Sequence, residues 1–269
     1  MNIEKKFLET IKKYRLCNKK EKILVALSGG KDSAVTAYLL KKFGYNIEGL
    51  YIDLKIGKYS DDCLNAVNEL CERLKIKVYI YNIKEKQGKS IKEIWELVKK
   101  KKDLNNCAIC GVFKKWILNK EARRLKVNKI ATGHNLDDEV QTFLMNVLKG
   151  SPELSANSGA IIMNISDKKF IPRIKPLFYL DESEILKYAK KNKLVFVQGK
   201  CRYSQESYRG EVRDFVNKLS FKNKTNIINN FENIINSVRN NKKIKMQYCE
   251  KCGEPSRGKI CKKCEFVGF

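Results

Sequence analysis

The 269-residue sequence is poor in histidine, in acidic side chains and in long apolar runs. A single histidine, His134, cannot form a cluster of histidine metal ligands. The longest strongly apolar run near the N-terminus covers residues 23–27, which is too short for a membrane span or a signal peptide. We therefore expect a cytoplasmic protein with no membrane segment, long enough to bury a substantial core.

The shortage of acidic side chains leaves a large positive excess. The chain has 56 Lys and Arg residues against 30 Asp and Glu residues, for a formal net charge of +26. Such a surface attracts polyanions, of which RNA and DNA are the commonest. The alternative is a nucleotide-composition bias in the genome, which would inflate Lys and Asn together. We expect a nucleic-acid partner, because Arg and aromatic residues recur near the candidate site.

Apolar strand patterns alternate with helical patterns along most of the chain. We predict a strand and turn over 22–30 and over 127–135, and further strands over 46–54, 77–83 and 194–199. Helices are predicted over 32–44, 62–75, 91–101 and 136–150, and the pattern from 203 to 245 is helical and polar. Strands separated by helices of this length form a parallel sheet covered on both faces. The predicted fold class is therefore α/β, a doubly wound parallel sheet.

The turn SGGKDS, residues 28–33, follows a buried strand and opens a helix. Backbone N–H groups and the helix N-terminus converge there on one point, which stabilises an anion. Asp32 would repel a phosphate unless a magnesium ion bridged them, so it is a candidate magnesium ligand. The alternative is an ordinary strand-to-helix turn, but the full context favours nucleotide binding. The candidate phosphate ligands are Ser28, Gly29, Gly30, Lys31 and Ser33.

Ten cysteines in an intracellular protein indicate metal binding or catalysis rather than disulfides. Cys107 and Cys110 supply two ligands, too few for a closed zinc site. Cys201 follows the predicted last strand, and the carboxyl ends of parallel strands face one crevice. Three thiolates there would hold an iron–sulfur cluster with one iron open to a ligand. The alternative is a redox pair, in which Cys107 or Cys110 carries a persulfide that Cys201 resolves as a disulfide.

Three other cysteines are interpreted as core residues. Cys63 and Cys71 lie on one face of the predicted helix over 62–75, and Cys17 stands alone near the N-terminus. We therefore expect all three to pack in the interior.

The C-terminal segment 249–264 contains two CxxC pairs separated by eight residues. Four thiolates in so short a segment are typical of tetrahedral structural zinc, and the segment has almost no apolar core of its own. Lysines and Arg257 around it indicate a surface that faces RNA, or else a zinc module with no RNA role. The predicted zinc ligands are Cys249, Cys252, Cys261 and Cys264.

Polar residues after two other strands point into the same crevice. Gly133 in the turn over 133–135 would allow close approach of a nucleotide. Asn135 would cap the next helix, and Asp138 in its first turn either favours the helix dipole or takes part in chemistry. His134 is interpreted equally well as a residue of the site or as a turn residue with local hydrogen bonds. Asp53 ends the second strand, where it would meet the adenosine, although an Asp at a strand end is commonplace. Lys114, one turn beyond Cys110, would stabilise an α-phosphate or orient a base, or it is simply solvated.

The segment after Cys201 contains further residues that could bind phosphate or RNA bases. Arg209 and Arg213 lie four apart on one helix face, where they would clamp phosphate or pair with Glu206 and Glu211. Tyr203 and Tyr208 would stack on bases or pack in the interior.

In combination, five segments of the chain resemble one enzyme family: SGGKDS, CAIC (107–110), ATGHNLDDEVQT (131–142), RIKPL (173–177) and GKCRYSQESYRGEVRDF (199–215). The first resembles the signature of PP-loop ATP pyrophosphatases, which adenylate a carbonyl oxygen and release pyrophosphate. Together, in the family's order, they resemble the TtuA/NcsA-type tRNA 2-thiouridine synthetases, with the TtcA-type 2-thiocytidine enzymes as cousins.

The resemblance implies a sulfurtransferase that uses ATP and Mg²⁺, with a [4Fe-4S] cluster on Cys107, Cys110 and Cys201 that binds sulfide on its free iron. It implies catalytic roles for Asp32, Lys114 and Asp138, and ATP contacts at Gly133 and the SGGKDS turn. The expected substrate is a tRNA uridine, at wobble position 34, with U54, C32 or a persulfide mechanism as alternatives.

The resemblance also sets expectations for partners and domains. The sulfur donor would be free sulfide or a ubiquitin-like thiocarboxylate carrier, and a homodimer would enlarge the RNA surface. The expected domains are an N-terminal helix (1–20), a PP-loop domain of the adenine nucleotide alpha hydrolase-like fold (21–215), a helical segment (216–245) and a zinc ribbon (246–269).

Overall fold

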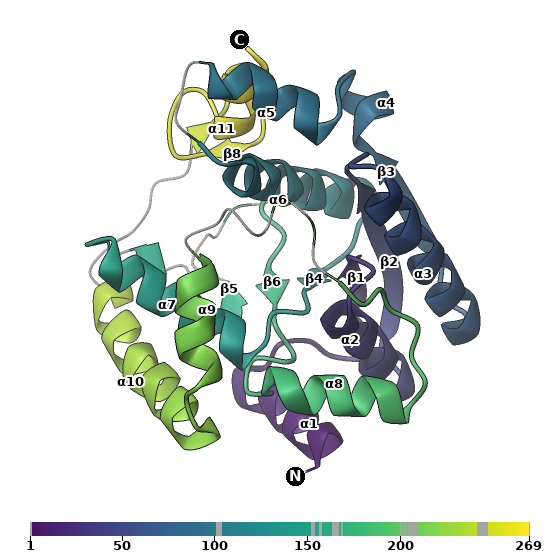
Figure 1. Cartoon of the computed structure of the whole chain (residues 1–269), viewed down its shortest axis with the longest axis vertical. Coiled ribbons are helices and arrows are strands. Elements are labelled where there is room, and N and C mark those ends of the chain that lie inside the picture. The colour runs from purple at the N-terminus through teal and green to yellow at the C-terminus, as the bar shows by residue number, and fades with distance from the viewer. Residues whose placement is uncertain are drawn as a thin grey trace.

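A computed structural model describes residues 2–100, 104–151, 154–155, 158–162, 167, 169–199, 201, 203, 209–240 and 247–268, and for 234–240 the backbone alone. The N- and C-termini lie at opposite ends of the longest axis (Figure 1). The strands are β1 (Lys22–Leu27), β2 (Asn46–Asp53), β3 (Val78–Asn82), β4 (Lys129–Ala131), β5 (Ile161–Ile162), β6 (Arg173–Ile174), β7 (Gln247–Tyr248) and β8 (Pro255–Ser256).

Helices precede, separate and follow these strands. They are α1 (Ile3–Tyr14), α2 (Lys31–Lys42), α3 (Lys58–Leu74), α4 (Ile83–Gln87), α5 (Ile91–Lys99), α6 (Asn106–Arg124), α7 (Leu136–Leu148), α8 (Glu182–Lys191), α9 (Arg209–Asn217), α10 (Phe221–Asn240) and α11 (Lys262–Val267). No described helix combines the length and the apolar character needed to cross a membrane.

The central sheet has six strands in the order β3-β2-β1-β4-β6-β5. All neighbouring strands pair in parallel except β5, which runs antiparallel to β6 at one edge. The central strand β1 is almost wholly apolar, as expected for a strand covered on both faces. The prediction of a doubly wound α/β fold is confirmed, with the addition of the antiparallel edge strand.

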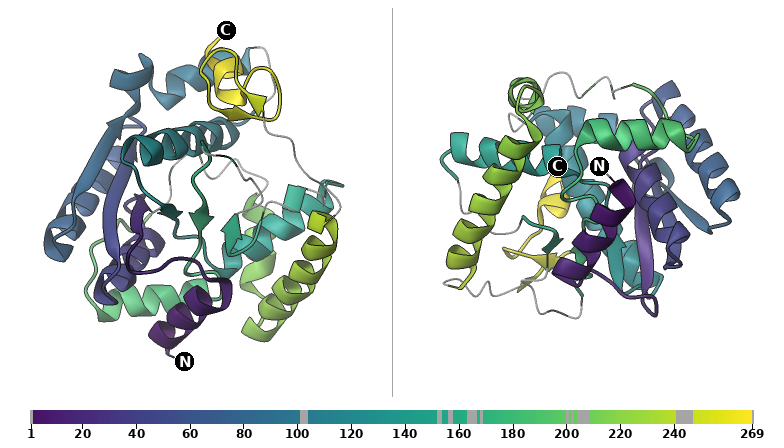
Figure 2. Two further views of the ribbon diagram at one scale, coloured as in Figure 1. Left: turned by 180° about the vertical axis from the view of Figure 1, so that it is seen from behind. Right: turned by 90° about the horizontal axis from the view of Figure 1, so that it is seen from below.

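Separate apolar layers cover the two faces of the sheet. Helices α1, α2, α3 and α8 bury their apolar residues against one face, together with α7, α9 and α10. Helices α5 and α6 cover the other face. Figure 2 shows the same two layers from behind and from below. Because the parallel strands all end at the same edge, the turns that follow β1 and β4 are brought together there.

The strand predicted over 194–199 is wrong. The segment is extended but belongs to no sheet, and Leu194, Phe196 and Val197 pack on the helical layer that contains α2. The Val197 N–H donates to the carbonyl of Gly29, in the turn after β1, at 2.8 Å. The position beside β4 is taken by β6 instead. Cys201 therefore does not follow the carboxyl end of a strand, as predicted. It follows an extended segment that lies outside the sheet.

Helices α9 and α10 pack along α7 at one side of the sheet (Figures 1 and 2). The contact is fixed by Lys224 of α10, whose buried ammonium lies 2.5 Å from Asp137 and 2.7 Å from Asp181. Two carboxylates compensate one buried lysine, so this ion pair cluster holds α10 against the first turns of α7 and α8. The helical character predicted for 203–245 is confirmed over the described helices.

Candidate active site

The SGGKDS turn has the geometry of an anion site. Gly30 is the N-cap of α2 and forms no side-chain cap, so the first N–H groups of the helix are not satisfied by a capping side chain. The hydroxyls of Ser28 and Ser33 lie 3.1 Å apart and brace the turn from within. Gly29 has φ +79°, a conformation that favours glycine. The turn therefore leaves the N-terminal N–H groups of α2 open to an anion, and no side chain at Gly29 or Gly30 blocks the way to them.

Gly29 also marks a contact that the sequence did not predict. A Cβ added at Gly29 would lie 2.7 Å from the Cβ of Cys63 and 2.9 Å from its Sγ. Cys63 is buried in the core, as expected, and it also lies against the phosphate turn. Cys201 and Lys114 lie close enough to Cys63 to influence its thiol, whose pKa is raised mainly by burial. The nucleotide turn and the mid-chain cysteine region therefore meet at Cys63.

Charged side chains surround the start of α2. The Lys31 ammonium lies 2.7 Å from Glu182 and 3.1 Å from Asp32. Burial opposes protonation of Lys31, but the two carboxylates raise its pKa overall. The other oxygen of Asp32 accepts a hydrogen bond from Asn135 at 3.1 Å. Burial raises the pKa of Asp32, and the nearby Asp138 raises it further.

Two carboxylates thus approach the site from different turns. Asn135 caps α7, as predicted, and Asp138 completes a capping box with it. Asp138 also lies 3.5 Å from Arg209, and burial raises its pKa. Because Asp138 raises the pKa of Asp32, the two carboxylates lie near enough to interact, and a cation such as Mg²⁺ would favour their charged forms. The magnesium ion itself stays a prediction.

Gly133 brings the β4–α7 turn against the phosphate turn. A Cβ at Gly133 would lie 2.8 Å from the backbone carbon of Asp32 and 2.8 Å from the nitrogen of Ser33. The close approach that requires glycine is therefore made by the protein's own backbone. This contact locks the two turns together at the edge of the sheet.

The single histidine is held neutral beside these turns. Its Nδ1 lies 2.9 Å from the Thr132 hydroxyl, which fits the predicted local hydrogen bond. Burial lowers the pKa of His134 to about 4, and nearby Lys175 lowers it further. Lys175 is itself buried and pairs with Glu139 at 2.6 Å. His134 therefore carries no charge at neutral pH.

Three cysteines from two distant segments gather beside the turns. Cys107 lies in the first turn of α6 and its thiol donates to the Tyr203 carbonyl at 3.3 Å. Cys110 and Cys201 both pack on the apolar layer that includes α6. Burial raises the pKa of Cys107, as do Cys110 and Cys201, whereas Lys114 lowers it. The structure thus brings the predicted third thiol to the predicted pair.

The chemistry of these three residues suits an iron–sulfur cluster. All three are free cysteines; Cys110 and Cys201 are partly buried, and Cys107 is exposed. Iron–sulfur clusters are held by cysteine thiolates, and three thiolates would leave one iron of a four-iron cluster open to another ligand. The residues present therefore fit the predicted cluster.

The C-terminal cysteines form a compact group. Cys249, Cys252, Cys261 and Cys264 place their sulfurs within 4.8 Å of one another, and those of Cys252 and Cys261 are 3.7 Å apart. Tetrahedral zinc with bonds of about 2.3 Å separates its sulfurs by roughly 3.8 Å, so this group could bind zinc. Although burial opposes it, backbone N–H donors of Cys261, Cys252 and Lys251 lower the pKa of Cys249 to about 6.

The four-cysteine module is docked on the α/β domain. Helix α11 packs against α6 and α5, and Trp116 of α6 contacts the cysteine group. Glu254 pairs with Arg123 and accepts a bond from Asn119 at 3.3 Å. The module is therefore attached to the same helix that carries Cys107 and Cys110.

The remaining candidates are placed less centrally. Asp53 is buried at the end of β2 and pairs with Lys55 of its own loop at 2.8 Å, so its predicted contact with adenosine stays a prediction. Arg209 pairs with Asp138 and donates to Thr142 at 3.0 Å, rather than to Glu211. Glu206 and Tyr208 lie outside the described residues, whereas Tyr203 packs on the layer around α6.

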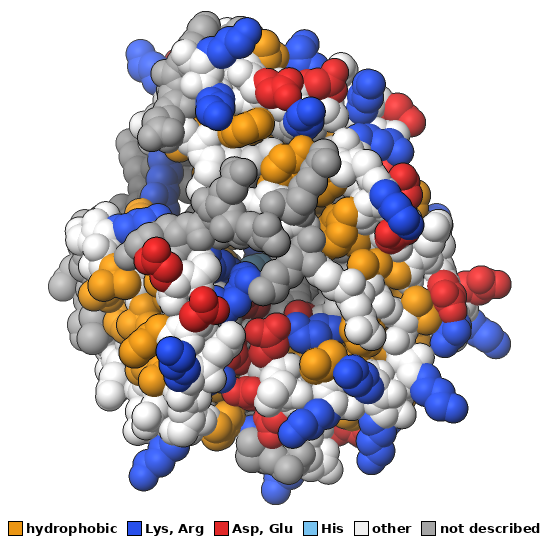
Figure 3. Space-filling view, in the orientation of Figure 1, with side chains coloured by type: hydrophobic (Ala, Val, Ile, Leu, Met, Phe, Trp, Pro, Cys, Tyr) orange, Lys and Arg blue, Asp and Glu red, His pale blue; other side chains and the backbone are white. Residues whose placement is uncertain are grey.

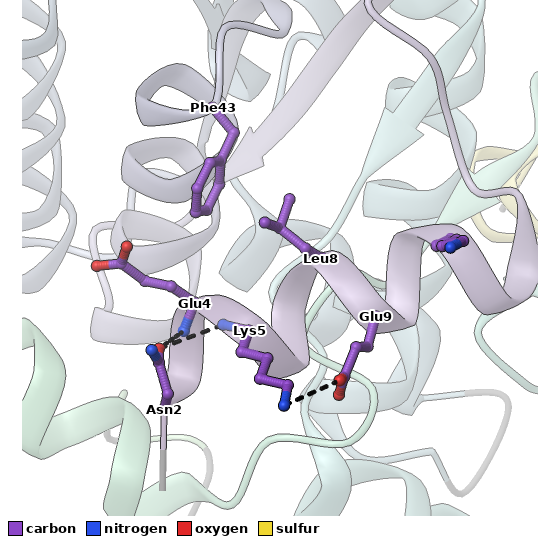
Figure 4. A pocket seen from close by; sticks show the side chains of 7 residues that line it. Asn2, Glu4, Lys5, Leu8, Glu9 and Phe43 are labelled. Atoms are coloured by element: carbon purple, nitrogen blue, oxygen red, sulfur yellow. Dashed lines mark hydrogen bonds and ion pairs between the residues drawn. The ribbon is translucent and has the colours of Figure 1, made fainter.

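A hollow near the centre of one face coincides with charged side chains. Lys and Arg side chains are visible inside it, and Asp and Glu side chains lie along one side (Figure 3). A separate pocket of about 390 Å³ lies at the N-terminus of α1. Its polar groups are engaged with each other: Asn2 caps the helix, Lys5 lies 4.0 Å from Glu9, and Glu4 pairs with Lys42 (Figure 4). This pocket contains none of the predicted site residues.

Both the fold and the glycine turn define a PP-loop protein. The family described as "PP-loop domain" matches residues 1–220. The chain is 38% identical over 272 residues to the tRNA-5-methyluridine(54) 2-sulfurtransferase of Pyrococcus horikoshii, covering 99% of this chain and 84% of that protein. It is 35% identical to cytoplasmic tRNA 2-thiolation protein 1 of Danio rerio, covering 97% and 78% of the two chains.

A solved structure agrees with these relatives. The U34-tRNA thiolase NcsA from Methanococcus maripaludis, with its [4Fe-4S] cluster, superposes with a TM-score of 0.82 at 30% identity. The match covers 99% of this chain and 86% of that one. The chain therefore belongs to the PP-loop family, in its branch of TtuA/NcsA-type tRNA 2-thiolation proteins.

Proposed function

We propose that this protein uses ATP to replace the 2-oxygen of a tRNA uridine with sulfur, at wobble position 34. The contact of Gly29 with Cys63, beside Cys201, carries the proposal, because it joins a phosphate-binding turn to a group of thiols. Relatives named as tRNA 2-sulfurtransferase and U34-tRNA thiolase support the substrate class.

Activation is the first requirement, because the 2-carbonyl of uracil is a poor electrophile. The carbonyl oxygen would attack the α-phosphorus of ATP, and pyrophosphate would leave. The open N-terminus of α2 and the hydroxyls of Ser28 and Ser33 would bind the departing phosphates. Asp32 and Asp138 would hold Mg²⁺ against them, and Lys114 would stabilise charge on the α-phosphate.

Sulfur delivery is the second requirement. A [4Fe-4S] cluster held by Cys107, Cys110 and Cys201 would supply an open iron position for sulfide when bound. The protein's own contribution is to keep these thiols partly buried beside the base, with Lys114 near Cys107 and Cys63. Addition of sulfur at C2 then expels AMP, which completes the exchange of oxygen for sulfur.

Three accompanying features complete the proposal. The four C-terminal cysteines would hold Zn²⁺ and keep their module folded against α6. The sulfur donor would be free sulfide or a ubiquitin-like thiocarboxylate carrier, and two chains would pair as a homodimer in the cytoplasm. The boundaries 1–20, 21–215, 216–245 and 246–269 remain the proposed division of the chain.

Position 54 is the second candidate, because the Pyrococcus relative is named for that position. Both candidates share the activation and sulfur-transfer steps and differ only in how the tRNA is presented. A test must therefore report the modified position as well as the reaction.

Anaerobically purified protein would be incubated with ATP, sulfide and an unmodified tRNA transcript. We expect AMP and pyrophosphate to form together with 2-thiouridine, and fragment mass spectrometry to locate the sulfur at position 34. A transcript with cytidine at position 34 should stop the reaction, and one with cytidine at 54 should not. The reverse pattern would move the activity to position 54, and ATP turnover independent of any tRNA would contradict the proposal.

A further inference from the structure

Basic side chains from three separate segments converge between the sheet and the C-terminal module. Arg173 of β6 donates through Nη2 to the backbone carbonyl of Lys115 on α6, at 3.0 Å. Arg257, in the loop after β8, lies near enough to Lys115 to lower its pKa, together with Arg173, although burial is the main cause. These three residues are called the cationic cluster below.

The cationic cluster lacks compensating anions within the described ranges. Lys115, Arg173 and Arg257 form no ion pair with any described carboxylate. The Nε of Arg173 is buried and has no hydrogen-bond partner there, and burial lowers the pKa of this guanidinium to about 10. Positive groups held together without an anion repel one another, so a bound anion would stabilise the arrangement.

Two basic residues near the cationic cluster are paired with carboxylates of the protein. Lys175 lies two residues beyond Arg173 and pairs with Glu139 at 2.6 Å, while Arg209 pairs with Asp138. Both also lie close to Lys115, whose pKa they lower. The charges next to the cluster are therefore neutralised by the protein, whereas the charges of the cluster are left for a ligand.

The cationic cluster is distinct from the proposed binding site of the ATP phosphates. The SGGKDS turn has its own N–H donors and its own lysine, Lys31. The cluster instead spans the joint between α6, β6 and the four-cysteine module, and Arg257 belongs to that module. A ligand that touches all three must extend from the site to the module, which a phosphodiester chain does and a single triphosphate on the turn does not.

We infer that Lys115, Arg173 and Arg257 form a binding site for backbone phosphates of the RNA substrate, next to the reacting base. The inference rests on the proposed function and assigns a place on the molecule to its RNA. Arginine forks suit phosphate oxygens, and such contacts position an RNA without reading its sequence. The four-cysteine module would then contribute directly to substrate binding through Arg257.

The test compares two double variants that lose the same charge. K115Q/R257Q removes two members of the cluster, and K120Q/K259Q removes one exposed lysine from the same helix and one from the same module. Binding of a tRNA transcript would be measured at several salt concentrations, with the full-length, metal-loaded protein. Each lost phosphate contact should lower the slope of log affinity against log salt by about 1.

We expect K115Q/R257Q to lower this slope by about 2 and to weaken binding several-fold at each salt concentration, while K120Q/K259Q stays within about 0.5 of wild type. Binding of ATP without tRNA should be unchanged in both. An equal loss of tRNA affinity in the two variants would overturn the inference, and so would weakened ATP binding in K115Q/R257Q alone. Absence of salt-dependent tRNA binding by the wild-type protein would overturn the proposed function with it.

Discussion

The two cysteine groups of this protein are built in opposite ways. The C-terminal group takes four ligands from residues 249–264, and their sulfurs already lie within 4.8 Å of one another. The mid-chain group combines two cysteines of α6 with Cys201, which lies far away in the sequence. A compact, four-ligand group suits a closed structural ion, whereas a three-ligand group leaves room for chemistry.

Removal of one ligand from each group tests this difference most strongly. We expect Cys201→Ala to abolish iron–sulfur assembly and reduce thiolation to background, with zinc content near that of wild type. Cys264→Ala should do the reverse to the metals: zinc is lost and the module's thermal transition disappears, but iron is retained. Metal analysis of both anaerobically purified variants decides the matter. Full activity in Cys201→Ala, or loss of iron in Cys264→Ala, would contradict the division of roles.

A second test sharpens the link between the mid-chain group and the nucleotide turn. Gly29→Ala would place a Cβ against Cys63 in a left-handed conformation, which should lower the free energy of unfolding by about 3 kcal/mol and weaken ATP binding. Gly88→Ala has a similar φ of +74° but nothing within 4 Å, so we expect a loss of only about 1 kcal/mol. Denaturant unfolding and ATP titration measure both, and equal losses would show that the contact with Cys63 is unimportant.

The third and smallest predicted effect concerns how stability depends on pH. It separates the contribution of His134, at the edge of the sheet, from that of the two cysteine groups. The folded state keeps His134 neutral, with a pKa of about 4 against 6.5 in the unfolded chain. This preference contributes stability above pH 6.5 that is lost as pH falls from 6.5 towards 4. Complete burial would make it about 3 kcal/mol, but the side chain is exposed and solvent weakens the effect, so about 1 kcal/mol or less is expected.

His134→Gln isolates this contribution because it leaves both cysteine groups intact. The difference in unfolding free energy between wild type and variant should shrink as pH falls from 7 to 4. Whatever acid sensitivity persists in the variant belongs to the metal groups and to the carboxylates. A difference that is constant with pH would show that His134 does not titrate as described.

The sequence allowed prediction of features whose signal is local. The apolar run of β1, the glycine turn after it and the CxxC spacings each lie within one short segment, and each is present in the structure. The segment 194–199 was misread because its alternating apolar residues pack on helices instead of a neighbouring strand. Strand β6 was missed because two residues, Arg173 and Ile174, give no periodic pattern.

Features made by distant segments could not be predicted in this way. Cys63 was interpreted as a core residue, and it is buried, but its contact with Gly29 depends on how α3 packs beside the turn. The meeting of Lys115, Arg173 and Arg257 likewise depends on where β6 and the C-terminal module dock. Neither contact leaves a trace in the local order of residues.

The different spans of the two cysteine groups also imply an order of maturation. Ligands between residues 249 and 264 can meet after closure of a short loop, which costs little entropy and needs no other part of the chain. Cys107 and Cys201 can meet only after the sheet and its covering helices have been assembled, since contacts between distant segments form late. The short segment would thus be able to bind its ion without the rest of the fold, whereas the proposed mid-chain centre would have to be assembled on a domain that has already folded.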